Sequence, residues 1–427
     1  MRLLDKIIFL LLFVGLLFIS LNRHSHHPIF NYHSQIFADK AGYHVYLPGY
    51  FYYDMEADSM EKSLVEKTGN GFRFEENKII TKYPIGVAIC QLPFFALASG
   101  VDAVKEINSN QGFTDTHHLA LNWATAVWGV LGLVLIFLTA IRYWSLSRNR
   151  AYLLVFTLLF TTNLLYYMTR DCGMSHTYSF TVFAAIQYLV FSCLDRQKIA
   201  TRDVLLLLPL FSLLIVLRPL NLLFVLLPLT YILLIHRNKI KRLKFSIRLW
   251  GWIVGVILGA IPLLLQISYN YYAYGKPIAD GYENESFSNL SSMDLLMLWF
   301  SPNNGALLYS PLLVLVFVAV IQQFRVKNYL SLIYPIFFLV ISFTYAAWWS
   351  PELGCGFGHR GFTEHLAFFA LPIAGFFSSL SKPIVRITWI GVIVVAALLF
   401  VAQFNFDGCW QSENNWNWGL FFSFFRI

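Results

Sequence analysis

The chain of 427 residues is 57% hydrophobic and only 13% charged, and its mean hydropathy is +0.59. Soluble domains carry about 25% charged residues, so this composition excludes a soluble protein and predicts an integral membrane protein. The net charge of +8 does not indicate a nucleic-acid partner, because the basic residues fall in short loops between apolar stretches. The chain leaves no room for a separate soluble domain beyond its first loop.

The apolar stretches predict an all-α polytopic membrane protein, because a helix that crosses the bilayer core needs about 20 apolar residues. The short pair around Arg218-Pro219 predicts a tight helical hairpin or one strongly kinked helix, since proline cannot continue a helix without a break. About 11 spans are expected, at residues 7–21, 117–141, 151–169, 176–194, 204–217, 219–235, 249–270, 305–321, 329–347, 363–380 and 387–404.

The first stretch has Arg2 and Lys6 before an apolar run, as a signal peptide would. No small-x-small cleavage site follows it, so we expect an uncleaved first span. Positive charge predicts a cytoplasmic N-terminus, because 18 of the 31 Lys and Arg residues lie in the N-terminus and the loops at 142–150, 195–203, 236–248, 322–328 and 381–386. On that topology 20 of the 23 acids lie outside, which favours the outer face as the working surface.

We expect one integral membrane domain over residues 1–427, with a first extracytoplasmic loop at 22–116 and an aromatic extracytoplasmic tail at 405–427. The first loop is the longest, and it carries Asp39 within the aromatic run 37–48. Aspartate suits the removal of a proton from a hydroxyl at a membrane surface. Asp39 is therefore the candidate catalytic residue.

The segment 81–98 of the first loop is apolar but is broken by Pro84 and Pro93. We expect a helix that lies in the membrane interface rather than one that crosses it. Reading this segment as a span would reverse every later loop and place the basic segment 236–248 outside, which the charges oppose.

The outer face collects polar groups near membrane depth. Arg170, Asp171 and His176 lie in one tight turn, and Arg218 lies between two apolar helices. An arginine at such a depth costs about 2.5–3.5 kcal/mol, so Arg218 needs an anionic partner. A lipid phosphate would serve, and snorkelling or pairing with a nearby carboxylate is the structural alternative.

Two later outer loops are rich in aromatic residues. The tyrosines and tryptophans of 270–282 and 299–311 are either interfacial anchors or surfaces on which sugar rings stack. The segment 348–360 adds three glycines, His359 and Arg360, and such backbone N–H groups and arginine suit phosphate oxygens. His359 alone would more often be a structural hydrogen-bonding group.

Metal binding is not indicated. His24, His26, His27 and His33 fit no standard ligand spacing and read as a polar juxtamembrane segment, as do His117 and His118 at the next span. Asp115, just before that span, is a candidate second acid. The five cysteines also lack metal-ligand spacing. Either a disulfide or free thiols would fit the three that are expected outside, Cys172, Cys355 and Cys409.

The order of these features resembles the GT-C superfamily of membrane glycosyltransferases, in particular the bacterial branch related to protein O-mannosyltransferases and lipid A aminoarabinose transferases. The resemblance covers most of the chain. The pieces that carry it are Asp39 with Tyr43 and Tyr46, the run Lys82–Gly86, Arg170–His176, Leu217–Asn221, Asn270–Tyr282, Ser301–Pro311 and Trp349–Arg360.

The resemblance implies a GT-C-like fold, a polyprenyl-phosphate sugar donor, an outer-face active site and a first-loop aspartate that activates a lipid, glycan or protein acceptor. No metal, nucleotide or other cofactor is expected, because such a donor is already activated and its leaving group is already anionic. Membrane lipids are the surroundings. Donor phosphate binding is then expected from Arg218, Arg360, Arg170, Lys82 and His359. Substrate binding is expected from Tyr43, Tyr46, Asp115, Asp171, His176, Tyr282, Asn303, Trp349 and Glu352.

Other functions remain open at this point. A transporter or lipid-linked sugar flippase also has many spans and buried charges, although the inverted repeats common in transporters are not seen here. A polysaccharide polymerase would more typically place its large loop late in the chain. A membrane scaffold would leave Arg218 and the 348–360 cluster unexplained.

Overall fold

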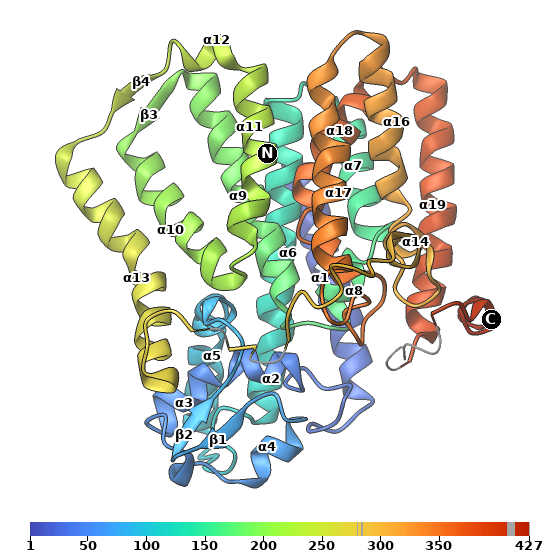
Figure 1. Cartoon of the computed structure of the whole chain (residues 1–427). Helices are drawn as coiled ribbons and strands as arrows, with labels where there is room; N and C mark the ends of the chain where they lie inside the picture. The colour runs from blue at the N-terminus through green and yellow to red at the C-terminus, as the bar shows by residue number, and fades with distance from the viewer. Residues whose placement is uncertain (280, 283–284, 408–414, 427) are drawn as a thin grey trace.

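The computed structural model describes residues 1–279, 281–282, 285–407 and 415–426. Long helices run side by side in a bundle, and the first loop forms a compact region at one end of it (Figure 1). Within the described residues the strands form two small sheets of two strands each. The architecture is therefore all-α, with the polar first loop gathered at one end of the bundle.

Seven helical segments of the described chain are long and apolar enough to cross a membrane, which confirms the predicted polytopic membrane fold. They are α1 (Leu3–Ser25), α5 (Gly86–Val104), α6 (Asp115–Arg142), α9 (Ser175–Arg196), α13 (Leu249–Tyr274), the continuous segment Tyr329–Ala346 made of η2 (Tyr329–Leu332) and α17 (Ile333–Ala346), and α19 (Lys382–Asn405). Shorter apolar helices are α11 (Asn221–Ile235), α16 (Leu312–Arg325) and α18 (Leu366–Ser379).

Two predicted spans are each broken into two helices. The stretch 151–169 forms α7 (Arg148–Phe160) and α8 (Leu164–Thr169). The hydroxyls of two threonines between them bond back to carbonyls of α7, and this competes with a continuous helix. The stretch 305–321 forms α15 (Ala306–Tyr309) and α16, because Pro311 lacks the N–H that would continue the helix.

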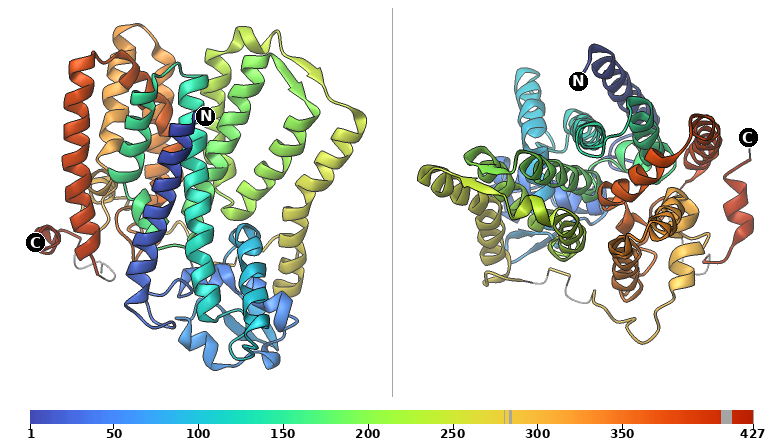
Figure 2. Two further views of the ribbon diagram at one scale, coloured as in Figure 1. Left: turned by 180° about the vertical axis from the view of Figure 1, so that it is seen from behind. Right: turned by 90° about the horizontal axis from the view of Figure 1, so that it is seen from above.

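The predicted break at Arg218-Pro219 is confirmed. α10 (Thr201–Leu217) ends directly before it, and α11 begins at Asn221. α10 pairs with α13, and this pair leans away from the other helices (Figure 1; Figure 2 shows the same from behind). Short parallel strands, β3 (Lys198–Ala200) and β4 (Lys244–Ser246), join the two helices at the end opposite the first loop.

The apolar part of the first loop forms α5, which begins and ends later than the predicted segment 81–98. It lies along the first half of α6, where the Trp128 indole donates to the Cys90 carbonyl (3.2 Å) and Ser99 bonds His117 (3.2 Å). By length and hydropathy α5 is one of the seven candidate spans. Its orientation in the interface stays a prediction.

The polar part of the first loop is folded into short elements. Two of these elements, β1 (Arg73–Glu75) and β2 (Lys78–Ile80), form an antiparallel hairpin in which Phe74 faces Ile79. The hairpin turns through Glu76 and Asn77, both with positive φ (47° and 58°), as a tight two-residue turn requires. The elements are α2 (Asp39–His44), α3 (Tyr46–Tyr52), η1 (Ala57–Ser59), α4 (Ser63–Lys67), β1 (Arg73–Glu75) and β2 (Lys78–Ile80).

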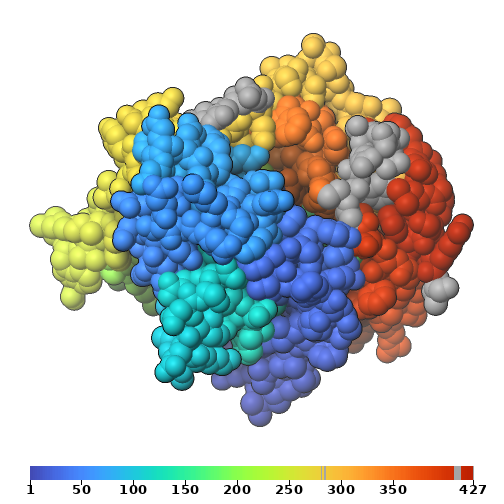
Figure 3. Space-filling model, turned by 90° about the horizontal axis from the view of Figure 1, so that it is seen from below, coloured from blue at the N-terminus to red at the C-terminus, as the bar shows by residue number. Residues whose placement is uncertain are grey.

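The remaining elements are short and lie in the loops between the long helices. In the aromatic tail, Phe421 packs edge-on against Tyr309 (5.6 Å between ring centres). Seen from below, the first loop covers much of the face on which the segments around residue 350 also emerge (Figure 3). The remaining short elements are α12 (Arg237–Ile240), α14 (Leu295–Phe300) and η3 (Arg360–Phe362), together with α20 (Trp418–Ser423) in the aromatic tail.

Glycines allow the first loop to pack backbone against backbone. A Cβ on Gly71 would lie below 3.0 Å from the Ala38 carbonyl oxygen, and a Cβ on Gly42 would lie equally close to the Gly71 carbonyl. A Cβ on Gly86 would collide with the backbone at the end of α10. These close approaches fix the first loop against itself and against the start of the Arg218 turn.

We expect Gly71→Ala to lower the free energy of unfolding by about 1–3 kcal/mol, because the new methyl group overlaps backbone atoms that cannot rotate away. The matched control is Gly100→Ala on α5, where nothing lies within 4 Å of a Cβ; this change is neutral or slightly stabilising in a helix. Thermal unfolding in detergent measures both, and equal midpoints would contradict the packing argument.

Candidate active site

A cavity of about 510 Å³ lies where the first loop meets the ends of the helices. Its walls come from the first loop, the start of α9, the α10–α11 turn and the segments before and after residue 350. It brings together eight of the predicted site residues: Asp39, Tyr43, Lys82, His176, Arg218, Tyr282, Trp349 and Arg360. Other polar and aromatic lining residues are Tyr83, Glu285, Tyr345 and Trp348.

Asp39 is the first residue of α2, and the residue before it has an unusual backbone. Ala38 has φ 49° and ψ −124°, a region that L-residues rarely adopt. Its N–H donates to the Thr68 carbonyl (2.8 Å), which holds the strained backbone in place. Such strain persists only where the surroundings enforce it, and it is common at functional sites. Here the unusual backbone directly precedes the candidate base.

The Asp39 carboxylate has two partners. Arg360 donates to Oδ2 (3.0 Å), and the Tyr83 hydroxyl donates to Oδ1 (2.6 Å). Burial would raise the pKa of Asp39, but the charge of Arg360, the hydrogen bond from Tyr83 and the charge of Lys82 hold that pKa below its ordinary value. The carboxylate, 30% exposed to the cavities, is therefore ionised at neutral pH and able to accept a proton.

A second ion pair lies behind the cavity wall. Arg218 donates to Oε1 of Glu364 (3.1 Å), and Oε2 of Glu364 lies 2.6 Å from Nδ1 of His176. Nδ1 also lies 3.0 Å from the Arg218 guanidinium, whose carbon is 5.8 Å from the Tyr345 ring centre. Glu364 has no exposed surface, whereas Arg218 keeps 20% of its side chain exposed. Arg218 therefore has a protein counter-ion and still presents donors to the cavity.

Lys82 supplies the third positive charge. Its ammonium pairs with Glu285 and lies 5.4 Å from the ring centres of both Tyr83 and Tyr282. These contacts link the first loop to the loop that follows α13. Since about a third of the Lys82 side chain is exposed, the ammonium remains accessible from the cavity.

Asp39 lies at the meeting point of three cavities. Besides the first, a cavity of about 280 Å³ is lined by Asp39, Arg360 and the turn after α8, and one of about 350 Å³ is lined by Asp39, Tyr83 and residues 69–73. Asp39 and Arg360 form part of the wall shared by the first two cavities, and Asp39 also lines the third. The arrangement leaves room for a donor and an acceptor beside the same carboxylate.

Arg170 and Asp171 line the second cavity rather than the first. Asp171 pairs with Lys40 (3.0 Å), and Arg170 pairs with Asp407 (3.2 Å) and donates to the Gln403 carbonyl (3.1 Å). Arg170 therefore does not share the cavity of Arg218 and Lys82.

Four other predicted residues do not line the main cavity. Tyr46 is buried and donates to the Tyr83 carbonyl (2.5 Å), so it supports the loop that carries Tyr83. Asn303 is buried beside Ser301, whose hydroxyl accepts its backbone N–H (2.9 Å). The Glu352 carbonyl accepts from Asn304 (3.2 Å). Asp115 is exposed at the start of α6.

His359 is fully enclosed by protein. Its Nε2 bonds the Pro351 carbonyl (2.8 Å), and only 2% of the residue is exposed. Burial lowers the pKa of His359 to about 4, so its imidazole is neutral at pH 7. A neutral ring adds no positive charge for a phosphate, and its place next to Arg360 suggests support of the 351–360 backbone.

The sequence analysis did not single out Glu364 or Tyr83. The sequence does hold a signal for Glu364, because a lone acid at the start of the predicted span 363–380 needs a partner. Tyr83 stands within the Lys82–Gly86 run, but its role depends on its contact with Asp39, which sequence spacing does not reveal.

The cysteines divide between free thiols and a disulfide. Cys90, Cys172 and Cys193 are free and buried, so the possibility that Cys172 forms a disulfide is wrong. Cys355 is disulfide-bonded, and Cys409 lies outside the described residues. In the part of the chain that the structure describes, no group of three His, Cys, Asp or Glu side chains is placed to hold a metal.

We expect Glu364→Gln to lower the free energy of unfolding by about 3–5 kcal/mol, because the variant leaves Arg218 without its buried counter-ion. The matched control is Glu285→Gln, whose pair with Lys82 is partly exposed and is expected to be worth about 0–1 kcal/mol. Thermal unfolding in detergent compares them, and a larger loss for the Glu285 variant would refute the assignment.

No protein-family model and no curated protein sequence matches the chain. Among solved structures it is similar to ArnT from Cupriavidus metallidurans bound to undecaprenyl phosphate, with a TM-score of 0.55 and 13% identity. It is similar to apo ArnT from the same organism, with a TM-score of 0.54 and 12% identity.

Each match covers 94% of this chain but 65% or 64% of the ArnT chain, so this protein spans less than two thirds of ArnT's length. The likeness confirms the fold expected from the sequence: this chain is an all-α polytopic membrane protein with a fold similar to that of ArnT.

Proposed function

We propose that this protein is an inverting membrane glycosyltransferase. It transfers a sugar from a polyprenyl-phosphate donor to an acceptor hydroxyl at the outer face of a bacterial cytoplasmic membrane. The observation that carries the proposal is the ionised Asp39, held by Arg360 and Tyr83 at the junction of three cavities. A solved structure with this fold, ArnT, is bound to undecaprenyl phosphate, which supports a lipid-linked donor.

In this proposal Asp39 accepts the proton of the acceptor hydroxyl, while the oxygen of that hydroxyl attacks the anomeric carbon of the donor. The bond between that carbon and the phosphate oxygen breaks, and its electrons leave with the polyprenyl phosphate. Attack opposite to the leaving group inverts the anomeric centre. The step needs no oxidant, reductant or nucleotide, because the donor already carries an activated leaving group.

Arg218, Arg360 and Lys82 hold the departing phosphate, since all three line the main cavity. Fixed positive groups aimed at developing negative charge are usually the largest contribution to catalysis. Each of the three already has a carboxylate partner: Arg360 with Asp39, Arg218 with Glu364 and Lys82 with Glu285. Arginine has five N–H donors and can serve a carboxylate and a phosphate together. Trp348, Trp349 and Tyr282 offer aromatic faces for the sugar.

Asp39→Asn should leave folding intact and lower transfer by about 10²–10⁴-fold, the usual contribution of a general base. The experiment follows label from a panel of radiolabelled polyprenyl-phosphate sugars into a membrane-extract acceptor, with the purified full chain. Asp58→Asn, in the same loop and exposed, is the matched control and should transfer normally. Near-normal turnover by the Asp39 variant would remove Asp39 from its role.

The same panel in proteoliposomes tests the flippase alternative. A transferase gives label in a new product, whereas a flippase moves the intact labelled lipid across the bilayer without a product. Movement without product, unchanged in Asp39→Asn, would overturn the proposed function.

Arg360 has two proposed roles, lowering the pKa of Asp39 and binding the departing phosphate, and the pH profile distinguishes them. Because Arg360 holds the pKa of Asp39 down, wild-type kcat/KM should fall only below the ordinary aspartate pKa of about 3.9. In Arg360→Gln burial still raises the pKa of Asp39 while its main opposing charge is gone, so the acid limb should move to higher pH. Arg218→Gln should lower the rate without moving the limb. An unmoved limb in Arg360→Gln would contradict the coupling.

A further inference from the structure

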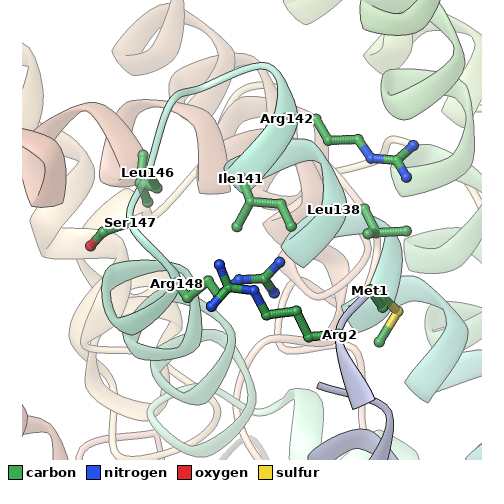
Figure 4. A pocket seen from close by; sticks show the side chains of 8 residues that line it. All are labelled: Met1, Arg2, Leu138, Ile141, Arg142, Leu146, Ser147 and Arg148. Atoms are coloured by element: carbon green, nitrogen blue, oxygen red, sulfur yellow. The ribbon is translucent and has the colours of Figure 1, made fainter. Parts of the chain in front are cut away.

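A cavity of about 680 Å³ lies at the end of the bundle opposite Asp39 and plays no part in the proposed reaction. It is formed where α1 begins, α6 ends and α7 begins (Figure 4). Its lining combines positive charge with apolar side chains: Arg2, Arg142 and Arg148, with Leu138, Ile141 and Leu146. A pocket with a basic part and an apolar wall suits an amphiphilic anion.

The positive charge of this pocket is only partly balanced. Asp5, a buried acid next to the pocket, accepts from Arg148, from the Tyr152 hydroxyl (2.6 Å) and from the backbone N–H of Arg2 (2.6 Å). Arg142 donates to the Tyr188 hydroxyl (2.5 Å), a neutral partner. In the described chain no carboxylate lies within ion-pair distance of the Arg2 or Arg142 side chain. Among the residues that the structure describes, Arg2 and Arg142 therefore have no anionic partner for their side chains.

Two helix N-termini add to the positive charge around the pocket. α7 begins in the pocket. Its N-cap residue Ser147 makes no side-chain cap, so the first N–H groups of the helix have no capping side chain to accept their hydrogen bonds. α1 also begins here, next to the chain's amino terminus. Helix N-termini carry partial positive charge and stabilise anions, which reinforces the three arginines.

The surface beside the pocket is apolar. α1 exposes a row of large aliphatic side chains directly after Arg2, including Leu3 (73% exposed), Leu4 (63%), Leu10 (60%) and Leu11 (65%). In a multi-pass membrane protein such a face contacts lipid. The basic pocket thus lies where the polar headgroups of the membrane adjoin their acyl chains, which favours a lipid over a soluble anion.

We propose that this pocket binds the phosphate of an anionic glycerophospholipid, with the acyl chains along the exposed face of α1. Basic pockets between membrane helices are a recurring form of recognition for acidic lipid headgroups. Arg2, whose guanidinium lies beside that of Arg148, supplies charge-assisted bonds to the phosphate, and the α7 N-terminus adds backbone donors (Figure 4). Arg142, whose guanidinium turns away from these two and donates to Tyr188, adds positive charge at the edge of the pocket. The bound lipid joins α1, α6 and α7 at the end of the bundle remote from Asp39.

The test uses the purified full chain in a neutral detergent and follows the thermal unfolding midpoint during titration with phosphatidylglycerol. Phosphatidylcholine with the same acyl chains and inorganic phosphate are the comparison ligands. Phosphatidylglycerol should raise the midpoint in a saturable way, as a ligand of the folded state does, and the other two should not. An equal response to phosphatidylcholine or to inorganic phosphate would overturn the proposal.

The variant is Arg2→Gln with Arg142→Gln, because Arg148 must be kept as the partner of buried Asp5. Its apparent affinity for phosphatidylglycerol should fall at least about tenfold, the effect of losing charge-assisted bonds. The matched control removes the same charge at exposed positions outside the pocket, Arg237→Gln with Arg242→Gln, and should respond as wild type does.

If the double variant does not fold, native mass spectrometry of the wild type replaces it. Phosphatidylglycerol adducts that survive where phosphatidylcholine adducts are lost support the site. Loss of both lipids together, or a double variant that binds as well as the control, overturns it.

Discussion

The ion pair between Asp39 and Arg360 is the interaction on which the rest of the site depends. It keeps the carboxylate ionised in a partly buried setting, and it holds a guanidinium beside the cavity in which a phosphate would separate from a sugar. One contact of 3.0 Å thus serves both the deprotonation of the acceptor and the binding of the departing phosphate in the proposed reaction. The pairing of Arg218 with the fully buried Glu364 follows the same design, because a buried charge without a partner is costly.

The framework that holds this pair combines the buried apolar side chains of the first loop with close backbone contacts at glycines. Gly42 and Gly71 let the segment around Ala38 and the segment after α4 meet without side chains between them. Gly86 lets the start of α5 touch the end of α10, which brings the Lys82–Tyr83 run near Arg218. The geometry of the base is therefore coupled to the helix bundle through three glycines.

Much of this was accessible from sequence, because hydropathy and charge dominate membrane proteins. Apolar stretches predicted the helices. Arg218 was predicted from its place between two apolar helices, and Arg360 from the glycine-rich segment 348–360. What failed depended on tertiary contacts. The helix breaks at 161–163, where two threonine hydroxyls bond back to carbonyls of α7, and no hydropathy window detects this break. Burial makes His359 neutral, and the partner of Arg218 lies 146 residues away, at Glu364.

The distance along the chain between the paired residues has a consequence for biogenesis. Asp39 and Arg360 are 321 residues apart, so synthesis at about 5–20 residues per second separates their emergence by roughly 16 to 64 seconds. During that interval the first loop carries an aspartate without its counter-ion. The site closes only when the last third of the chain has been inserted, so a prematurely terminated chain is membrane-embedded but has no assembled centre.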